Sequence, residues 1–424
     1  MNEDFLHYVW KYKMFSKVDF KTTDNAVLSI IKTGLHNKNA GPDFLNSELK
    51  IEDQTWVGNI EIHLKSSDWY LHNHEIDANY DAVILHVVWE NDAVVFMKNN
   101  KPLPTLVLKD FVNESVLDNY RNLVFTTAKW IPCQNLIGSV GDFIFDNWKE
   151  RLFFERLERK SDEITTLLQQ ENNNFEAVLF QLLAKNFGLK VNGDSFLRLA
   201  QSFDFSIIQK VSSDAHQLEA LLFGQAGFLE EPIENEYQQQ LQGTYAYLCH
   251  KYNLQSIINI QFSFFRMRPN NFPTIRIAQL TALFHKHQKL FSKLMTTNSL
   301  IDFYKLFAIE VAPFWKTHYN FESISKSSSK KLTTSFIDLL IINTVIPLKF
   351  LYQKARGEVD ETVFLEILKK MKPEKNSIIS KFSELGVVAK NAFETQALLT
   401  LKNNYCAPKR CLECAIGNSL LKRY

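Results

Sequence analysis

The spacing of hydrophobic and polar residues predicts a short helix followed by a β-rich segment. Asp4–Phe15 carries apolar side chains at helical spacing, which is typical of an amphipathic helix. From Ala26 to Val107 the apolar runs become short and are separated by turn residues. The predicted strands are Val27–Thr33, Ser47–Ile51, Trp56–Leu64, Ala82–Trp89, Ala93–Met97 and Thr105–Leu108.

After Trp130 the pattern is helical over almost the whole chain, with its clearest stretch beginning near Asp142. We therefore expect an α+β domain with a mixed sheet over residues 1–130 and a mostly α-helical region over residues 131–424. The longest apolar run, Phe336–Tyr352, includes charged residues and Pro347. It is too polar to span a bilayer, so we interpret it as a buried core helix with a kink or stop at Pro347 and expect no membrane partner.

Composition supports packed domains and adds a small asymmetry of charge. The 424 residues are 46% hydrophobic and 22% charged, as in ordinary globular proteins, and include 34 Phe. The N-terminus lacks the basic start of a signal peptide, so we expect a cytoplasmic protein. Residues 1–130 carry 18 acidic and 13 basic residues, and the remainder carries 29 and 35. This balance suits an acidic cation-binding part joined to a basic part, although ordinary surface variation explains it equally well.

The predicted strand that contains Glu61 and His63 offers candidate metal ligands. Side chains alternate along a strand, so Glu61 and His63 share one face while Ile60 and Ile62 occupy the other. If Asp43 begins the adjacent strand, its carboxylate meets both of them. Two carboxylates and an imidazole favour Mg²⁺ or Mn²⁺, or zinc if imidazoles dominate.

This arrangement resembles the PD-(D/E)XK nuclease superfamily, in which an Asp after a Pro begins one strand and an acidic-x-Lys triplet lies on the next. Pro42-Asp43 matches the first element, and Glu61-Ile62 matches the start of the second. The resemblance implies a restriction-endonuclease-like fold in which Asp43 and Glu61 hold the metal. His63 stands where the superfamily has Lys, and Lys65, one step further on the same face, is a possible substitute.

A second group of candidate residues follows this strand. Six of the 11 His precede Trp130, and four of them lie within one short stretch. Imidazoles near carboxylates indicate metal binding or proton transfer. The alternative is that His72 and His74 cap a loop and His86 is a satisfied residue of the sheet. The possible additional site comprises Asp68, His72, His74, Asp77 and His86.

Three of the five cysteines form a Cys-x4-Cys-x2-Cys pattern, and a fourth follows the β-rich domain. Clustered thiols in a cytoplasmic protein indicate a metal site, so we expect the end of the chain to pack back near Cys133. A four-thiolate site holds zinc or a [4Fe–4S] cluster. The alternative is a set of reduced thiols without a ligand. The predicted ligands are Cys133, Cys406, Cys411 and Cys414, whereas Cys249 lies in a helical pattern and is interpreted as a small buried residue.

Three arginines around a Pro- and Asn-rich loop are candidates for binding phosphate. Arg266 and Arg268 lie in the loop, and Arg276 opens the following helix. Guanidinium groups bind phosphate through paired hydrogen bonds. The structural alternative is that they pair with acids such as Glu394.

These features support three hypotheses. The first is a metal-dependent nuclease acting on DNA or RNA, with His63 or Lys65 assisting Asp43 and Glu61. The second is an inactive nucleic-acid-binding or scaffold protein on the same fold. The third is a metal-dependent hydrolase of another substrate that uses the His cluster, and metal preference would separate it from the first.

The whole chain also resembles an uncharacterised bacterial family of unknown function, and this resemblance implies no activity. The residues that carry it are Gly41-Pro42-Asp43-Phe44, Glu61-Ile62-His63, Ser67-Asp68-Trp69, His72, His74, His86-Val87-Val88, Arg268-Pro269 and the C-terminal cysteines.

Overall fold

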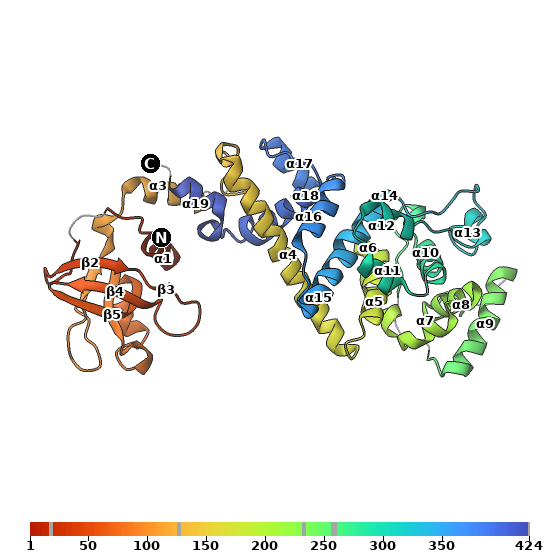
Figure 1. Cartoon of the computed structure of the whole chain (residues 1–424), viewed down its shortest axis with the longest axis horizontal. Helices are drawn as coiled ribbons and strands as arrows, with labels where there is room; N and C mark the ends of the chain where they lie inside the picture. The colour runs from red at the N-terminus through yellow and green to blue at the C-terminus, as the bar shows by residue number, and fades with distance from the viewer. Residues whose placement is uncertain (17–19, 125–128, 231–234, 256–260, 423–424) are drawn as a thin grey trace. The chain divides into compact units, whose positions relative to one another are not determined.

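The chain forms two compact units. The computed structural model describes residues 1–16, 20–124, 129–230, 235–255 and 261–422 (Figure 1). Unit 1 comprises Met1–Leu152, Asn376–Val388 and Leu398–Tyr424, and unit 2 comprises Phe153–Lys375 and Ala389–Ala397. The domain boundary predicted at residue 130 falls inside unit 1, because residues 131–152 and two C-terminal segments belong to the same compact unit as the β-rich part.

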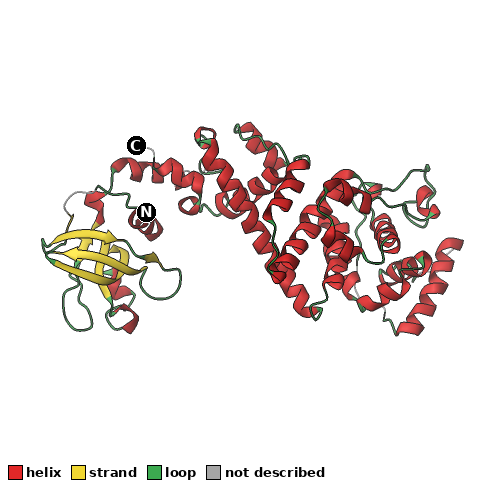
Figure 2. Ribbon diagram, in the orientation of Figure 1, coloured by secondary structure: helices red, strands yellow, loops and turns green. Residues whose placement is uncertain are grey.

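Unit 1 contains a seven-stranded mixed sheet, drawn in yellow in Figure 2. The strand order is β1-β2-β4-β5-β6-β7, and β3 also pairs with β4. Pairs among β1 to β5 are antiparallel, whereas β6 is parallel to both β5 and β7. The predicted mixed sheet is thus confirmed. The strands are β1 Phe20–Lys21, β2 Val27–Lys32, β3 Leu35–His36, β4 Phe44–Ile51, β5 Gln54–Lys65, β6 Val83–Glu90 and β7 Thr105–Val107.

The helices of unit 1 come from three separate parts of the sequence. Helices α4 (Asp142–Gln170) and α18 (Ala392–Thr400) each begin in one unit and end in the other. The remaining helical segments are α1 Glu3–Lys11, α2 Asp68–Leu71, η1 Ala78–Tyr80, η2 Leu108–Phe111, α3 Glu114–Val124, η3 Ile137–Ser139, α17 Ser377–Glu384, η6 Leu401–Cys406, η7 Cys411–Glu413 and α19 Ala415–Leu421.

Helix α1 covers the sheet with an apolar face. Its buried side chains include Phe5, Val9 and Trp10, and the Trp10 indole N–H donates to the Thr33 carbonyl at 3.0 Å. The helix ends at Lys11, earlier than the predicted end at Phe15. Lys13 has φ = +50°, a left-handed conformation that turns the chain out of the helix.

The C-terminal half of β5 is the centre of the sheet. β4 and β6 pair with its two edges, and Ile60, Glu61, Ile62 and His63 are all buried, so both of its faces are covered as well. Gly58 permits the close approach of β6, since a Cβ there would lie 2.4 Å from the Ile84 side chain. The fold therefore places two titratable side chains of β5, Glu61 and His63, inside the protein.

One predicted strand is wrong. Ala93–Met97 forms a loop in which Phe96 makes an isolated bridge with Pro102. Side chains satisfy part of the backbone there, because Ser66 Oγ accepts from the Ala93 amide at 2.9 Å and Tyr70 Oη accepts from the Phe96 amide at 2.9 Å. The alternating pattern alone does not distinguish these two ways of satisfying a backbone.

Unit 2 is mostly helical in its described residues, as predicted for this part of the chain, and its loops include an isolated bridge between His318 and Ile324. Side chains of Asn and Asp cap several of these helices, among them Asn174 at the start of α5. The helical segments are α5 Phe175–Phe187, α6 Leu189–Gln201, α7 Phe205–Val211, α8 Ala215–Gln225, α9 Glu236–Tyr252, η4 Pro269–Asn271, α10 Pro273–Lys286, α11 Leu290–Thr296, α12 Leu300–Leu306, α13 Pro313–Thr317, α14 Thr334–Leu340, η5 Ile341–Val345, α15 Ile346–Arg356 and α16 Glu361–Lys370.

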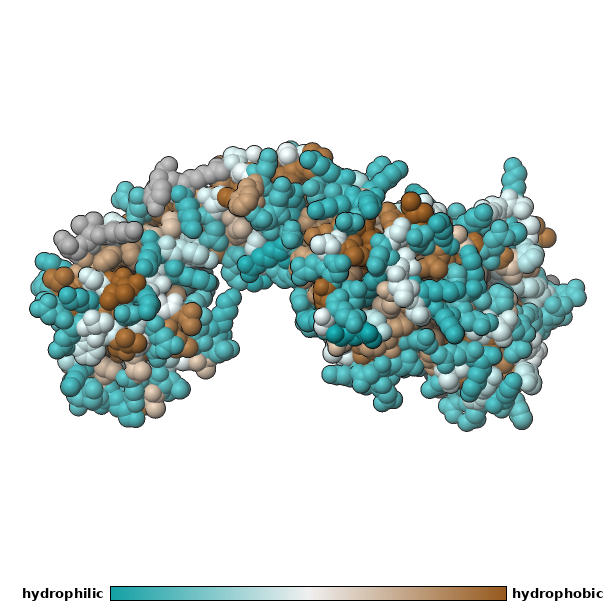
Figure 3. All heavy atoms as spheres, viewed as in Figure 1, coloured by the Kyte–Doolittle hydropathy of each residue, from teal (hydrophilic) through white to brown (hydrophobic). Residues whose placement is uncertain are grey.

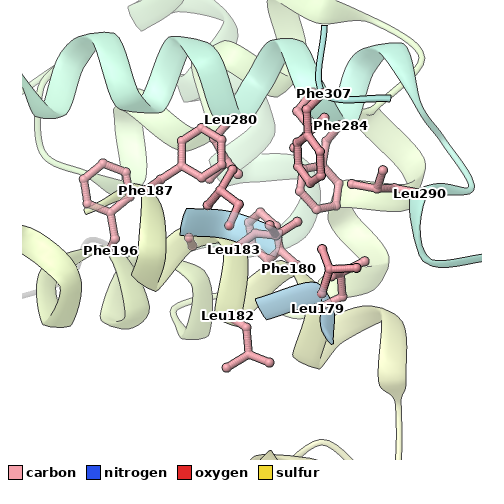
Figure 4. Close-up of a cluster of buried hydrophobic side chains, with 14 of the residues drawn as sticks. Leu179, Phe180, Leu182, Leu183, Phe187, Phe196, Leu280, Phe284, Leu290 and Phe307 are labelled. Atoms are coloured by element: carbon pink, nitrogen blue, oxygen red, sulfur yellow. The ribbon is translucent and has the colours of Figure 1, made fainter. Parts of the chain in front are cut away.

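The core of unit 2 is rich in phenylalanine. Figure 4 shows Phe180 and Leu183 of α5 packed with Phe284 of α10 and its neighbours. The Phe180 and Phe284 rings meet edge to face with their centroids 5.0 Å apart. On the face shown in Figure 3, hydrophilic residues predominate and hydrophobic residues form separate patches.

The longest apolar run forms one helix of 23 residues, Thr334–Arg356, made of α14, the π-helical turn η5 and α15. By length and composition it is a candidate to cross a membrane, but 67% of its most apolar window is buried inside the protein, as in a core helix. The helix does not stop at Pro347. Pro347 lies in the first turn of α15, directly after η5, where the π-helical turn accommodates its missing N–H.

Candidate metal centre

Two parallel strands hold a buried pair of histidines. Glu61 on β5 is in register with His86 on β6, and His63 lies two residues further along the same face of β5. His63 Nδ1 is 2.9 Å from His86 Nε2, so one proton is shared between two buried rings. This contact fixes the ring of His63 and leaves its Nε2 atom pointing away from β6.

Two more histidines approach from the segment after β5. His72 Nδ1 lies 3.2 Å from His63 Nε2, and His74 Nε2 lies 3.3 Å from Glu61 Oε1. The intervening Asn73 has φ = +59°, a left-handed turn that brings the two imidazoles to the same place. The His74 ring stacks on Tyr80 with 3.7 Å between centroids.

His63, His72 and His74 each present a ligand atom within 4.8 Å of the other two, the one such group of three among the described residues. Glu61 Oε1 adjoins them, 3.4 Å from His63 Nε2. His74 Nε2 is buried and faces Glu61 without completing a hydrogen bond within the described chain. His72 is the exposed member of the group, so the cluster opens to solvent on its side.

Asp43 lies next to this cluster and is bound by the backbone. Its carboxylate accepts the Ile62 amide at 2.9 Å and contacts His7 Nε2 at 3.1 Å. Its own amide donates to Glu61 Oε2 at 3.2 Å. Asp43, Glu61 and His63 therefore converge, as the sequence predicted.

Burial dominates the protonation of the cluster. It raises the pKa of the Glu61 carboxyl from 4.5 to about 7, against the opposing attraction of His74 Nε2, which lies 3.3 Å from Glu61 Oε1. Burial and the neighbouring imidazoles lower the pKa of His63 to about 2, and burial lowers the pKa of His86 to about 3. Both rings are neutral near pH 7, which is the form that binds metal.

His7 shows the opposite behaviour. Burial disfavours its charged form, but the hydrogen bond and the charge of Asp43 outweigh burial and raise the pKa of His7 above its ordinary value. The pKa of Glu3, one helical turn before His7, is raised by burial and by the charge of Asp43. The structure thus places an imidazole whose protonated form is favoured near two imidazoles, His63 and His86, whose neutral form is favoured.

The donor set differs from the predicted pair of carboxylates. Three imidazoles and Glu61 Oε1 face one another, whereas Asp43 is occupied by the Ile62 amide and His7. Histidine nitrogens with one carboxylate fit zinc, manganese or iron better than magnesium. His86 would support the ligand His63 without binding the metal itself, because it contacts His63 Nδ1 and thereby fixes the orientation of the ring.

The other candidate residues around β5 have local roles. Lys65 is exposed at the end of β5, and its amide donates to Asp68 Oδ2 at 2.9 Å. Asp77 caps η1 by accepting the Asn79 amide at 2.9 Å. Asp68 and Asp77 thus satisfy the backbone of the segment that carries His72 and His74.

The three arginines of unit 2 divide into two kinds. Arg276 is 6% exposed, donates to Asn271 and Gln279 at 2.7 and 2.8 Å, and lies over the Phe336 ring. Burial lowers the pKa of its guanidinium to about 10. Its two terminal nitrogens are thus engaged by amide side chains. Arg266 and Arg268 are exposed, and phosphate binding by them stays a prediction.

The cysteines predicted to bind metal lie together. Cys133, Cys406, Cys411 and Cys414 are free and buried, and they line a single small cavity of unit 1. Cys249 is half-buried in α9 of unit 2.

Sequence reasoning missed His7 and Tyr80. His7 follows Glu3 by four residues, so helical spacing places both on one face of α1. The sequence signal for His7 was its position on that helix face, in a chain whose other N-terminal histidines are mostly clustered. Tyr80 has no comparable signal, because its stacking on His74 depends on the path of the loop.

Residues 3–377 match a family described as "Protein of unknown function (DUF2851)". The match covers most of the chain, and the chain belongs to this family. The three C-terminal cysteines lie beyond the matched residues. Comparison with curated proteins and with solved structures gave no match.

Proposed function

We propose that this member of the family is a metal-dependent hydrolase that cleaves phosphodiester bonds of DNA or RNA. The observation that carries the proposal is the convergence of His63, His72 and His74 within 4.8 Å, with Glu61 adjoining them. Three imidazole nitrogens and a carboxylate oxygen gathered at one place are a donor set that a divalent cation would hold together.

The ligand atoms would be His63 Nε2, His72 Nδ1, His74 Nε2 and Glu61 Oε1. Such an ion lowers the pKa of a bound water and neutralises charge on a phosphoryl group. The exposed side of His72 gives the substrate access. His86 fixes the ring of His63 through their 2.9 Å contact.

His7 and Asp43 supply the acid of the proposed reaction. Asp43 acts against burial and raises the pKa of His7 above its ordinary value, which favours the protonated imidazole. His7 is partly exposed, at 16%, and lies next to the same edge of β5. A protonated imidazole there stabilises developing charge or gives a proton to the leaving oxygen.

The choice of phosphodiester as substrate rests on the order of the elements. A helix precedes the antiparallel strands β2, β4 and β5, and β6 then returns parallel to β5. Pro42-Asp43 precedes β4, and Glu61 lies on β5, as the resemblance to PD-(D/E)XK nucleases implies. These features support a restriction-endonuclease-like fold with a modified metal site.

A second candidate is a zinc hydrolase that acts on another substrate. It is favoured by the number of imidazoles, because nucleases of the resembled type bind metal mainly through carboxylates. Under this alternative the same residues bind zinc, and nucleic acid is not cleaved.

The decisive experiment measures cleavage of labelled single- and double-stranded DNA and RNA by protein purified without oxygen. Mg²⁺, Mn²⁺ and Zn²⁺ are added separately to the wild type and to His72→Ala, Glu61→Ala and His250→Ala. His250 is an exposed residue of α9 and serves as the matched histidine control. We expect cleavage with Mn²⁺ or Zn²⁺ that the first two substitutions abolish and the third preserves.

The metal content of the same samples separates the alternatives. Bound metal that depends on His72 and Glu61, without cleavage of any nucleic acid, would support the zinc hydrolase of another substrate. Absence of both metal binding and cleavage would refute the proposed function and favour an inactive nucleic-acid-binding or scaffold protein.

A further inference from the structure

Four cysteines from two distant parts of the chain surround one cavity in unit 1. Cys133 follows Pro132, Cys406 ends η6, Cys411 begins η7, and Cys414 precedes α19. All four are 7 to 8% exposed and none forms a disulfide. The other residues that line the cavity are Pro132, Leu401, Tyr405, Ile416 and Gly417.

The four sulfurs face one another. All four thiols line the same cavity, Cys133 from the turn after Trp130 and the other three from the C-terminal segment. Four buried thiols without a ligand would contribute little to the stability of the fold by lying around one cavity. Four thiolates around a cation, in contrast, would complete its coordination and stabilise the fold.

The spacing of the sulfurs distinguishes between the two predicted ligands. A single zinc ion holds its four sulfurs about 3.8 Å apart, from a tetrahedron with Zn–S bonds of ~2.3 Å. Among the described residues, His63, His72 and His74 are the one group of three with ligand atoms within 4.8 Å of one another. No three of the thiols are therefore as close as zinc requires. In a [4Fe–4S] cluster each sulfur binds a different iron, so the sulfurs are further apart.

The groups around the cavity suit an anionic cluster. Trp148 Nε1 is buried without a hydrogen-bond acceptor in the described chain. The Gly417 and Ile416 amides and the Trp148 indole interact with the Cys414 thiol. These N–H groups therefore lie beside the Cys414 sulfur, and a thiolate or a cluster sulfide would accept from Trp148.

Cations and a close backbone contact complete the site. Lys402 lies near Cys406 and donates to the Trp130 carbonyl at 2.7 Å, and Lys409 lies near Cys411. Gly417 is required because a Cβ there would lie 2.1 Å from the Cys411 carbonyl oxygen. The backbone thus wraps closely around the cavity on the side of α19.

We propose that these four cysteines bind a [4Fe–4S] cluster that fastens the C-terminal segment of unit 1 to the turn after Trp130. The [4Fe–4S]²⁺ core would be delivered already assembled by a cluster carrier. Each thiol loses one proton to the leaving ligand of the carrier or to solvent and forms one bond to one iron as the bond from that iron to the carrier breaks, and the core keeps its oxidation state. Four thiolates leave no open coordination position, so the role is structural. The proposal is independent of the function proposed for the histidine cluster.

The test is the iron, acid-labile sulfide and zinc content of the full chain purified without oxygen, together with its visible absorption. We expect four iron and four sulfide per chain in the wild type and in Cys249→Ser, and loss of most of both in Cys133→Ser. One zinc per chain without sulfide would overturn the cluster, and so would iron that persists unchanged in Cys133→Ser.

A second measurement uses the wild type alone, in case Cys133→Ser does not fold. Under native conditions without oxygen, an alkylating reagent should label Cys249 and leave the four cluster cysteines unmodified. After a chelator removes the iron, those four should become reactive as well. Equal labelling of all five cysteines in the iron-loaded protein would contradict the proposal.

Discussion

Replacing Glu61 with Gln should stabilise the metal-free protein near neutral pH. The carboxyl is ionised above pH 4.5 in the unfolded chain, but its pKa in the folded protein is raised to about 7 by burial. The folded state therefore loses stability as the pH rises from 4.5 to 7, and the loss is complete above that range. Gln keeps the shape of the side chain and removes the charge.

The magnitude follows from the two pKa values. At ~1.4 kcal/mol per pH unit, a rise from 4.5 to about 7 corresponds to about 3 kcal/mol at pH 8. At pH 5 the same relation gives less than about 1 kcal/mol. The advantage of Glu61→Gln should thus grow with pH, whereas its affinity for metal should fall because a ligand oxygen with charge is lost.

Hydrogen exchange of peptides from β5 and β6, in the presence of a chelator, measures the opening free energy at both pH values. It reports on the sheet alone and requires no two-state unfolding of the whole chain. The matched control is Glu48→Gln on β4, a partly exposed carboxylate paired with Lys32 at 2.7 Å, for which we expect a small change of similar size at pH 5 and pH 8. A loss of protection in Glu61→Gln at pH 8, or an equal effect at both pH values, would refute the reasoning.

Three further predictions concern unit 2. Phe180→Ala should lower the free energy of unfolding by about 3–5 kcal/mol in urea denaturation, because it opens a cavity next to Phe284, whereas Phe265→Ala at an exposed position of the same unit should have little effect. Asn174→Ala removes the cap that accepts two amides of α5 at 3.1 Å and should cost about 1 kcal/mol, seen as a lower Tm; an unchanged Tm would contradict the role of the cap. Burial raises the pKa of Glu219, so the stability of the wild type should fall as the pH rises above 4.5, and Glu219→Gln should flatten that dependence in urea titrations at pH 4 and 8.

Much of the candidate centre could be predicted because it depends on local patterns. Glu61 and His63 share a face through the period of a strand, and Pro42-Asp43 marks the start of its neighbour. The choice of ligands could not be predicted in the same way. It depends on which carboxylate the backbone occupies, and the Ile62 amide takes Asp43 while Glu61 stays available to the imidazoles.

The organisation of the chain was harder to infer than its secondary structure. Hydrophobic periodicity identifies helices but carries no information on which helices share a core. Residues 131–152 read as part of the helical region, yet they belong to the same unit as the sheet. The spacing of the cysteines was the one long-range signal, and it placed Cys133 with the C-terminal segment.

The order of synthesis gives the interrupted unit 1 a consequence in the cell. Unit 1 begins at the N-terminus, is interrupted by unit 2, and is completed by residues after Asn376. Cys133 and Cys406 are ~270 residues apart, so at ribosomal rates of ~5–20 residues per second the second emerges about 15 to 55 s after the first. During that interval the sheet is made but its C-terminal supports are absent, and this is the period in which a nascent chain would benefit most from a chaperone.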